Sequence, residues 1–184
     1  MHVKTDSELI GEFQNGEIKA YNELVRRYQQ KVYWIARRIV GTHEDADDVV
    51  QDTFLKIFNA LKKFRSESGF YTWLYRITIN TSLNALRKKK VREFLRLGEY
   101  AGEVPQSGPD AGEILVQQEY RTVVERAIQK LPPKQKMVFI MRYYDEMPFG
   151  EIAGILGKSV GGLKATYFFA LKKIKEYIRD EIKR

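Results

Sequence analysis

The chain has 184 residues and a net charge of +8, and its pI near 9.5 predicts a polyanionic partner, either nucleic acid or an anionic membrane surface. It contains no cysteine and two histidines, which excludes disulfides, thiolate metal sites and histidine-rich metal clusters. No apolar run is long enough to span a bilayer and the first residues lack a signal-peptide pattern, so we expect a cytoplasmic protein without membrane insertion.

Two helices open the chain. Asp6 or Ser7 can cap a first short helix. A long helix is expected over residues 17–40, because apolar side chains recur there at helical spacing. The Gly41-Thr42 pair then breaks the chain before a third helix begins.

The third predicted helix, within DADDVVQDTFLKIFNALKKF, carries two different faces. One is a continuous apolar stripe that includes Phe54 and Leu61. The other has an apolar leucine among polar groups and consists of Asp48, Gln51, Asp52 and Leu55. Acidic residues in a first turn also complement the helix dipole, so capping explains part of the pattern. We interpret the second face as a surface for a protein partner.

The stretch from residue 64 to residue 90 combines aromatic rings, amides and a basic tail. Aromatic faces stack on unpaired bases, lysine and arginine neutralise phosphate, and asparagine pairs with a base edge. A polar break at residues 65–69 lies between Phe64 and Phe70, so this loop and the following helical turns can form a pocket. The same rings recur at helical spacing, so each of them can instead belong to the core.

A row of hydrogen-bond donors follows the aromatic rings. Arg76, Asn80, Asn84 and Arg87 recur at steps of four, four and three residues, which places them on one helix face. Together with the rings, this row suits a nucleic-acid strand that has been pulled out of a duplex. A solvated polar face is the structural alternative.

Charge and composition divide the chain into two basic blocks and an acidic joint. Net charge is +6 over residues 1–92, −4 over 93–113 and +6 over 114–184. The joint contains GEYAGEVPQSGPDAG, which has no apolar period. We therefore predict an all-α protein in which two small helical domains, 1–92 and 114–184, are joined by a flexible linker over 93–113.

The C-terminal block predicts a helix-turn-helix. A short helix over residues 149–156, a turn through Gly157-Lys158-Ser159 and a long basic helix from Val160 match this arrangement, although a three-helix bundle can show the same period. The turn also ends like a phosphate-binding loop, but Ile152 stands where that loop needs glycine. No nucleophile triad, paired catalytic carboxylates or metal-ligand spacing occurs, so we expect no enzyme activity, cofactor or metal.

Three motifs resemble the extracytoplasmic function (ECF) sigma factors of bacterial RNA polymerase. They are DADDVVQDTFLKIF, FRSESGFYTWLYRITIN and LPPKQKMVFIMRYYDEMPFGEIAGILGKSVGGLKATYFFALKKIKE. The resemblance covers nearly the whole chain, and its middle motif is highly specific. It implies a cytoplasmic subunit that binds core polymerase and directs promoter recognition, promoter melting and transcription initiation. Residues 1–92 would form sigma region two, and residues 114–184 would form sigma region four.

The resemblance also assigns residues to partners. The clamp helices of the largest polymerase subunit would contact Asp48, Gln51, Asp52 and Leu55. The minus-ten element, with one flipped base, would be bound by Phe64, Arg65, Ser66, Ser68, Phe70, Arg76, Ile77, Asn80, Asn84 and Arg87. The minus-thirty-five element would be bound by Ser159, Gly161, Gly162, Lys164, Thr166, Phe168 and Lys172. The apolar segment 137–144 would meet the flap of the second-largest subunit, and an anti-sigma factor is a further implied partner.

The last helix departs from the family pattern. Thr166, Phe169 and Leu171 stand where arginine is frequent, and Met147-Pro148-Phe149 replaces the more usual Leu-Ser-Tyr. The Phe168-Phe169 pair can contact thymine methyl groups, flanking sugars or a protein partner, and the sequence does not decide among them. Two other functions stay open at this level. One is a stand-alone helix-turn-helix regulator that dimerises through its N-terminal bundle, and the other is a protein-interaction scaffold.

Overall fold

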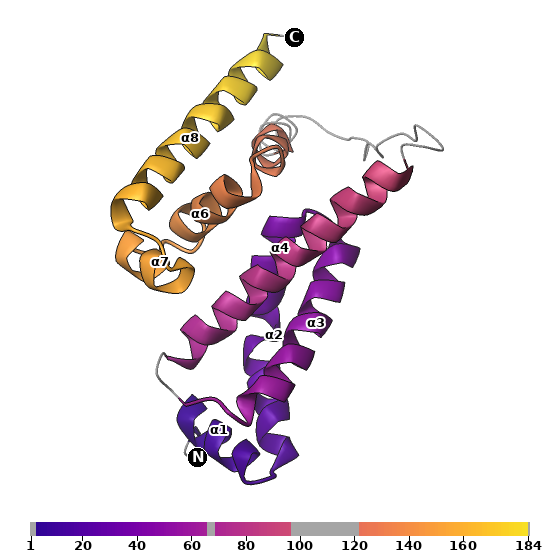
Figure 1. Cartoon of the computed structure of the whole chain (residues 1–184), viewed down its shortest axis with the longest axis vertical. Helices are drawn as coiled ribbons and strands as arrows, with labels where there is room; N and C mark the ends of the chain where they lie inside the picture. The colour runs from indigo at the N-terminus through magenta and orange to yellow at the C-terminus, as the bar shows by residue number, and fades with distance from the viewer. Residues whose placement is uncertain (1–2, 66–68, 97–121, 184) are drawn as a thin grey trace, which may run out of the picture. The chain divides into compact units, whose positions relative to one another are not determined.

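A computed structural model of the chain describes residues 3–65, 69–96 and 122–183 (Figure 1). Every element with defined bounds in these ranges is an α-helix: α1 (Asp6–Gln14), α2 (Ile18–Val40), α3 (His43–Leu61), α4 (Phe70–Arg96), α6 (Pro133–Tyr143), α7 (Phe149–Leu156) and α8 (Val160–Ile182). Residues 122–129 are helical as well. The chain forms two compact units, so the predictions of an all-α fold and of two helical bodies are confirmed.

The two compact units are divided inside a helix. The compact units meet between Leu86 and Arg87, inside α4. This helix continues to Arg96 and so runs past residue 92, where we placed the end of the first domain. Most of the predicted linker falls within residues 97–121, which lie outside the described residues.

The start of the first helix differs from the prediction. Thr5, rather than Asp6 or Ser7, caps α1, and its side chain forms a capping box with Glu8. Asp6 has another role, because its carboxylate accepts hydrogen bonds from Arg27 at 2.6 Å and from the Tyr28 hydroxyl. Asp6 therefore links α1 to α2, and Thr5 caps α1 in its place.

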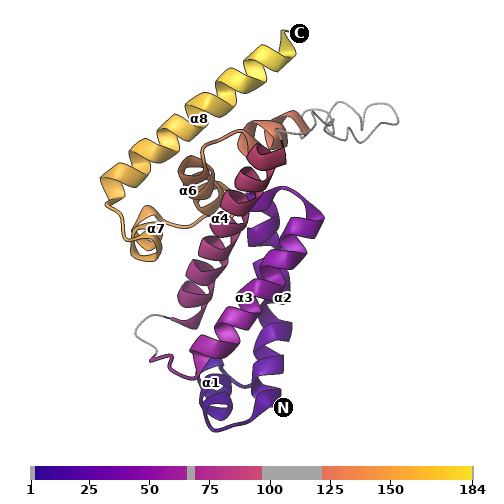
Figure 2. The same ribbon diagram turned by 45° about the vertical axis from the view of Figure 1, so that its right-hand side comes forward.

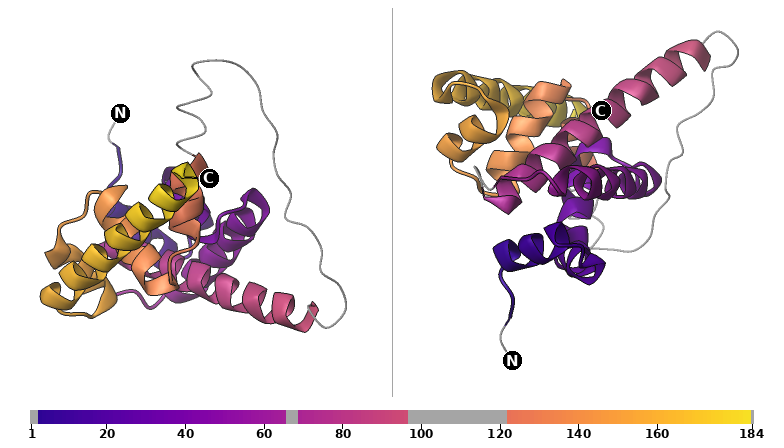
Figure 3. Two further views of the ribbon diagram at one scale, coloured as in Figure 1. Left: turned by 90° about the horizontal axis from the view of Figure 1, so that it is seen from above. Right: turned by 60° about the horizontal axis from the view of Figure 1, so that its bottom comes forward.

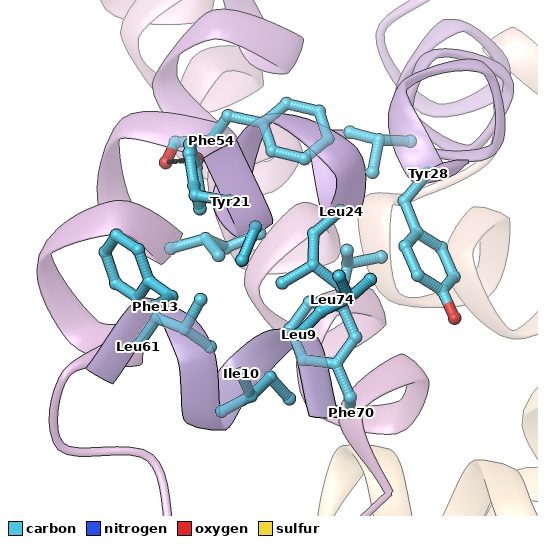
Figure 4. Packing of buried hydrophobic residues seen from close by; sticks show 13 residues of the cluster. Leu9, Ile10, Phe13, Tyr21, Leu24, Tyr28, Phe54, Leu61, Phe70 and Leu74 are labelled. Atoms are coloured by element: carbon cyan, nitrogen blue, oxygen red, sulfur yellow. Dashed lines mark hydrogen bonds between the residues drawn. The ribbon is translucent and has the colours of Figure 1, made fainter. Parts of the chain in front are cut away.

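The core of the first body lies among α1, α2, α3 and the start of α4. In Figure 2, α2, α3 and α4 run alongside one another, with α1 across one end. Figure 4 shows apolar side chains from all four helices meeting in this core, and its buried members include Phe13, Leu24, Leu61 and Leu74. The Tyr21 ring lies 5.4 Å from Phe13 and 5.1 Å from Phe58, in tilted and edge-to-face arrangements. This core holds both ends of the loop between α3 and α4.

Tyr21→Phe is expected to lower the free energy of unfolding at pH 7 by about 1 kcal/mol, because the Phe54 carbonyl loses its buried donor at 2.6 Å. Burial raises the pKa of Tyr21 from 10.0 to about 12, so this hydroxyl ionises first in the unfolded chain. The stability that it contributes is complete below pH 10 and is lost as the pH rises from 10 through 12. Urea unfolding of both proteins at neutral and alkaline pH measures the difference.

The gap between wild type and Tyr21→Phe should therefore narrow above pH 10, the ordinary pKa of tyrosine. Tyr143→Phe is the matched control, since this tyrosine is exposed and should leave stability unchanged. A gap that stays constant from neutral pH to pH 12 would contradict the assigned role of the buried hydroxyl.

The second body is built around α6, α8 and the helical segment 122–129. Its core includes Ile128, Leu131, Phe139, Ala170 and Ile174, all of them buried. The Phe139 ring stacks at 5.9 Å on Tyr167, which joins α6 to α8. In the views of Figure 3, α8 is the long yellow helix that follows the short α7.

Candidate functional site

The outer face of α3 carries the predicted partner surface. Thr42 caps the helix by accepting a hydrogen bond from the Asp45 amide. Ala46, Val49 and Ile57 turn one side of α3 into the protein core. The opposite side presents exposed polar groups and an exposed leucine: Asp48, Gln51, Asp52 and Leu55. Leu55 is 57% exposed, so its contact area is available to a partner.

An aromatic cluster anchors the loop between α3 and α4. Phe64, Phe70 and Trp73 form this cluster, and the Phe64 ring lies 4.7 Å from Trp73 and 6.1 Å from Phe70. The side-chain amide of Gln14 donates to the carbonyls of Leu61 at 3.0 Å and Phe64 at 3.1 Å. The chain is therefore held firmly just before the loop.

The two predicted stacking rings are not equivalent. Phe70 is 7% exposed and lies in the core, where its ring is 5.4 Å from Tyr28. It supports the loop and does not offer a free face to a base. Phe64 is half-buried, and Arg65 and Gly69 at the edges of the loop are exposed. Ser66 and Ser68 lie outside the described residues.

The predicted donor row occurs on α4. Arg76, Asn80, Asn84 and Arg87 are all exposed, and their spacing puts them on one face. Ile77, beside this row, is half-buried against the core. Asn80 follows Trp73 of the aromatic cluster by seven residues, so its amide is presented about two helical turns beyond that cluster.

Polar residues inside α4 keep its buried side satisfied. Thr78 donates to the Leu74 carbonyl and Ser82 donates to the Thr78 carbonyl, both at 2.9 Å. Thr81 is buried as well, and its hydroxyl accepts from Lys56 of α3 at 3.0 Å. The Lys56–Thr81 bond is the one of these three that joins α4 to another helix, and it helps to set the direction in which the donor row faces.

A basic and aromatic group beside the loop was missed by the sequence reasoning. Lys31 of α2 lies 5.4 Å from the ring centre of Tyr71 and 5.6 Å from that of Tyr28. Tyr71 is 36% exposed, at the start of α4. One signal in the sequence pointed to this group, because Lys31 follows Tyr28 by three residues on the same helix. The contact with Tyr71 depends on how α2 packs against α4.

The predicted helix-turn-helix is formed by α7 and α8. Gly157 ends α7 in the left-handed conformation at φ +62°, which only glycine adopts without strain. Its amide donates to the Ala153 carbonyl at 2.9 Å. Ser159 then caps α8 by accepting from the Gly162 amide at 3.2 Å. The rings of Phe149 and Tyr167 meet at 5.8 Å and hold the two helices together.

Most of the predicted contacts on α8 reach solvent. Ser159, Gly161, Gly162, Lys164, Phe168 and Lys172 are exposed. Thr166 is half-buried, and its hydroxyl donates to the Gly162 carbonyl at 2.8 Å. Because this donor is already used within the helix, Thr166 is the weakest of the predicted base contacts.

The expected apolar surface over residues 137–144 is mostly absent. Met137, Val138, Phe139, Ile140 and Met141 are buried, so they serve packing and are not presented to a partner. Tyr143 and Tyr144 remain exposed, and their rings meet edge to face at 5.2 Å. The exposed part of this segment is therefore a pair of tyrosines at the end of α6.

Metal sites and membrane-spanning helices are absent from the described part of the chain. No group of histidine, aspartate and glutamate side chains there could hold a metal ion. No helix among those residues is both long enough and apolar enough to cross a membrane.

Comparison with known proteins decides the family. The model of Sigma-70 region 2 matches residues 24–92, and the model of Sigma-70, region 4 matches residues 121–174. The ECF RNA polymerase sigma-E factor of Escherichia coli (strain K12) is 36% identical to this chain, over 98% of the chain and 97% of the relative. The chain belongs to the ECF sigma factor family. The RNA polymerase sigma-H factor of Pseudomonas aeruginosa is 31% identical to this ECF sigma factor, over 95% of it and 94% of the relative.

Two solved structures share the fold of this ECF sigma factor. CnrH in complex with the cytosolic domain of CnrY aligns with a TM-score of 0.67 and 23% identity, over 95% of this chain and 97% of that one. The sigma factor RpoE of Bartonella quintana, in complex with the anti-sigma factor NepR, gives a TM-score of 0.66 and 20% identity, over 88% and 98%. At these identities the likeness establishes the fold.

Family membership answers the functional question left open by the sequence. As an ECF sigma factor, the protein binds core RNA polymerase and promoter DNA and directs transcription initiation. It is not an enzyme, as predicted, because the polymerase carries out the catalysis. The alternatives of a stand-alone regulator and of an interaction scaffold are therefore not supported.

Proposed function

We propose that this ECF sigma factor opens promoters by capturing one base of the minus-ten element at the start of α4. The exposed donor row above a rigid aromatic support carries the proposal. Extracting a base from the stack costs a few kcal/mol, so the protein must offer compensating contacts in a fixed position. Asn80 can pair with the base edge, while Arg76 and Arg87 can neutralise nearby phosphates.

Phe64 and its neighbours shape the other side of this site. Because Phe70 is fixed in the core, we assign it the role of holding the loop in place. The half-buried Phe64 and the exposed Arg65 are the residues at the loop that can reach a base. The Tyr71 ring and Lys31 also lie beside the loop, but Tyr71 is nine residues before Asn80 and so faces the opposite side of α4, and the pair is not assigned to this site.

The outer face of α3 is proposed to bind the clamp helices of the largest polymerase subunit. Leu55 supplies apolar area on this face. Asp52 and Asp48 lie one and two helical turns before it and add negative charge on an otherwise basic chain. A central apolar anchor within a polar rim is the usual organisation of a specific protein interface.

The second body is proposed to bind the minus-thirty-five element through α8. The helix-turn-helix geometry supports this proposal, because the second helix of such a motif enters the major groove with its N-terminal residues leading. The exposed tyrosines at the end of α6 are the contact we propose for the flap of the second-largest subunit. An anti-sigma factor is a further proposed partner, because the similar RpoE is bound to one. We place this activity in the cytoplasm.

We keep 1–92 and 114–184 as the proposed functional domains, with 93–113 as the linker between them. Two modest DNA contacts on one chain gain affinity from effective concentration when the connection can span both elements.

Reconstituted transcription tests the proposed function. The full chain is mixed with core RNA polymerase and promoter DNA, and the start sites of the RNA are mapped. Initiation at a defined position only when the chain is present supports the proposal. Gel shifts on duplex DNA with and without core polymerase give the second measurement. Tight binding to a palindromic duplex without polymerase, together with no initiation, would contradict it.

A further inference from the structure

Two phenylalanines stand on the solvent side of α8. Phe168 is 63% exposed and Phe169 is 53% exposed, and their rings meet edge to face at 5.8 Å. The core side of this helix is formed by other residues, among them Leu163, Ala170 and Ile174. The ring pair is therefore not needed to hold the bundle together. Exposed apolar side chains that lie together are typical of an interaction surface.

The charge around the pair indicates the chemistry of that partner. From Val160 to Lys175, α8 carries lysines and no carboxylate. Lys164 and Lys172 lie one helical turn on either side of Phe168, and both are exposed. Apolar rings framed by cations on the second helix of a helix-turn-helix fit the major groove of duplex DNA, where phosphates flank the base edges.

The residues beside the two rings offer few groups that could contact a base edge. Gly161, Gly162 and Ala165 are exposed on the first turns of α8, and none of them carries a side chain that reaches a base edge. The hydroxyl of Thr166 is already engaged with the Gly162 carbonyl. Lysine and the two rings are therefore the long side chains of this face.

We propose that Phe168 and Phe169 read the C5-methyl groups of thymines in the upstream promoter element. This inference rests on the proposed function, because it assigns a specificity to the DNA-binding helix of the second body. Thymine is the base that presents a methyl group in the major groove, and phenylalanine contacts it by apolar packing. Lys164 and Lys172 contact phosphates and position the helix without selecting a sequence.

The test uses holoenzyme assembled from the full chain and core polymerase. A duplex library randomised upstream of the minus-ten element is selected for initiation, which identifies the preferred upstream bases. Each selected thymine is then replaced by deoxyuridine, which lacks the methyl group and keeps every hydrogen-bonding atom. Initiation should fall about fourfold for each methyl that the rings contact, the value of one buried methyl or methylene group.

Phe168→Ala and Phe169→Ala should each lose the preference for thymine at one position. Initiation by the matching variant should then be the same with thymine and with deoxyuridine, since methyl and ring act as a pair. Lys172→Ala is the matched control on the same helix, because it removes one of the two proposed phosphate contacts. It should weaken binding to all sequences alike, reduce the salt slope by about one and retain the deoxyuridine effect.

The possible failures can be told apart. If deoxyuridine has no effect on wild type, or if the alanine variants keep the thymine preference, the inference is wrong while initiation still supports the proposed function. If no upstream sequence is selected and no initiation occurs, the proposed function fails and the inference fails with it. Thermal unfolding followed by circular dichroism should be unchanged in both variants, because both rings are exposed.

Discussion

Asn80→Ala is expected to slow promoter opening by about 5- to 150-fold, because a two-point amide contact with a base edge is worth about 1–3 kcal/mol. The side chain is exposed on α4, so its loss should not disturb the fold. Opening can be followed with 2-aminopurine placed at each position of the minus-ten element, since its fluorescence rises when the base leaves the stack. Affinity for core polymerase, measured separately, should be unchanged.

Asn22→Ala is the matched control, because Asn22 is an exposed asparagine on α2 of the same body. It should open promoters at the wild-type rate. An Asn80→Ala protein that opens promoters normally would remove the basis for the captured base. A variant that instead loses affinity for polymerase would show that this face of α4 meets the enzyme.

Leu55→Ala is expected to weaken binding to core polymerase by about 10- to 100-fold, since fully burying a leucine is worth about 1.5–3 kcal/mol. The reason is its place on α3, where it is 57% exposed between polar groups. Fluorescence anisotropy of labelled sigma factor titrated with core polymerase measures the affinity. Once polymerase is saturated with the variant, the rate of promoter opening should return to the wild-type value.

Ile18→Ala provides the comparison for Leu55. Ile18 is 60% exposed at the start of α2, so the change removes similar apolar area from a different surface. It should leave the affinity for polymerase unchanged. Equal losses for the two variants would mean that the outer face of α3 is not a specific docking surface.

The sequence was most informative where residues of one kind recur at helical spacing. Their spacing alone puts Arg76, Asn80, Asn84 and Arg87 on one face, and the structure exposes all four. The same reasoning separated the two faces of α3 and assigned Leu55 to the outer one. The structure leaves this side chain exposed. Gly157 could be assigned to the turn because a left-handed residue at a helix end favours glycine.

The sequence was least informative where a residue's role depends on a distant element. Phe64 and Phe70 look alike in the sequence, yet Phe70 is buried beside Tyr28 while Phe64 is half-buried. Asp6 looked like a cap, but Arg27 and Tyr28 of the next helix take its carboxylate. Local patterns do not contain these contacts, because the partners are set by how the helices pack.

By itself, the sequence determined the helical class, the two basic blocks and the faces that meet solvent, since these follow from local periodicity and charge. Only the tertiary structure decided which aromatic rings at the loop between α3 and α4 are buried and which stay partly exposed. It also showed that the apolar run from Met137 to Met141 is core and that Phe168 and Phe169 are surface. The physical reason is that an apolar residue reads the same in the sequence whether it lies in the core or on the surface. Its burial depends on the neighbours that folding brings to it.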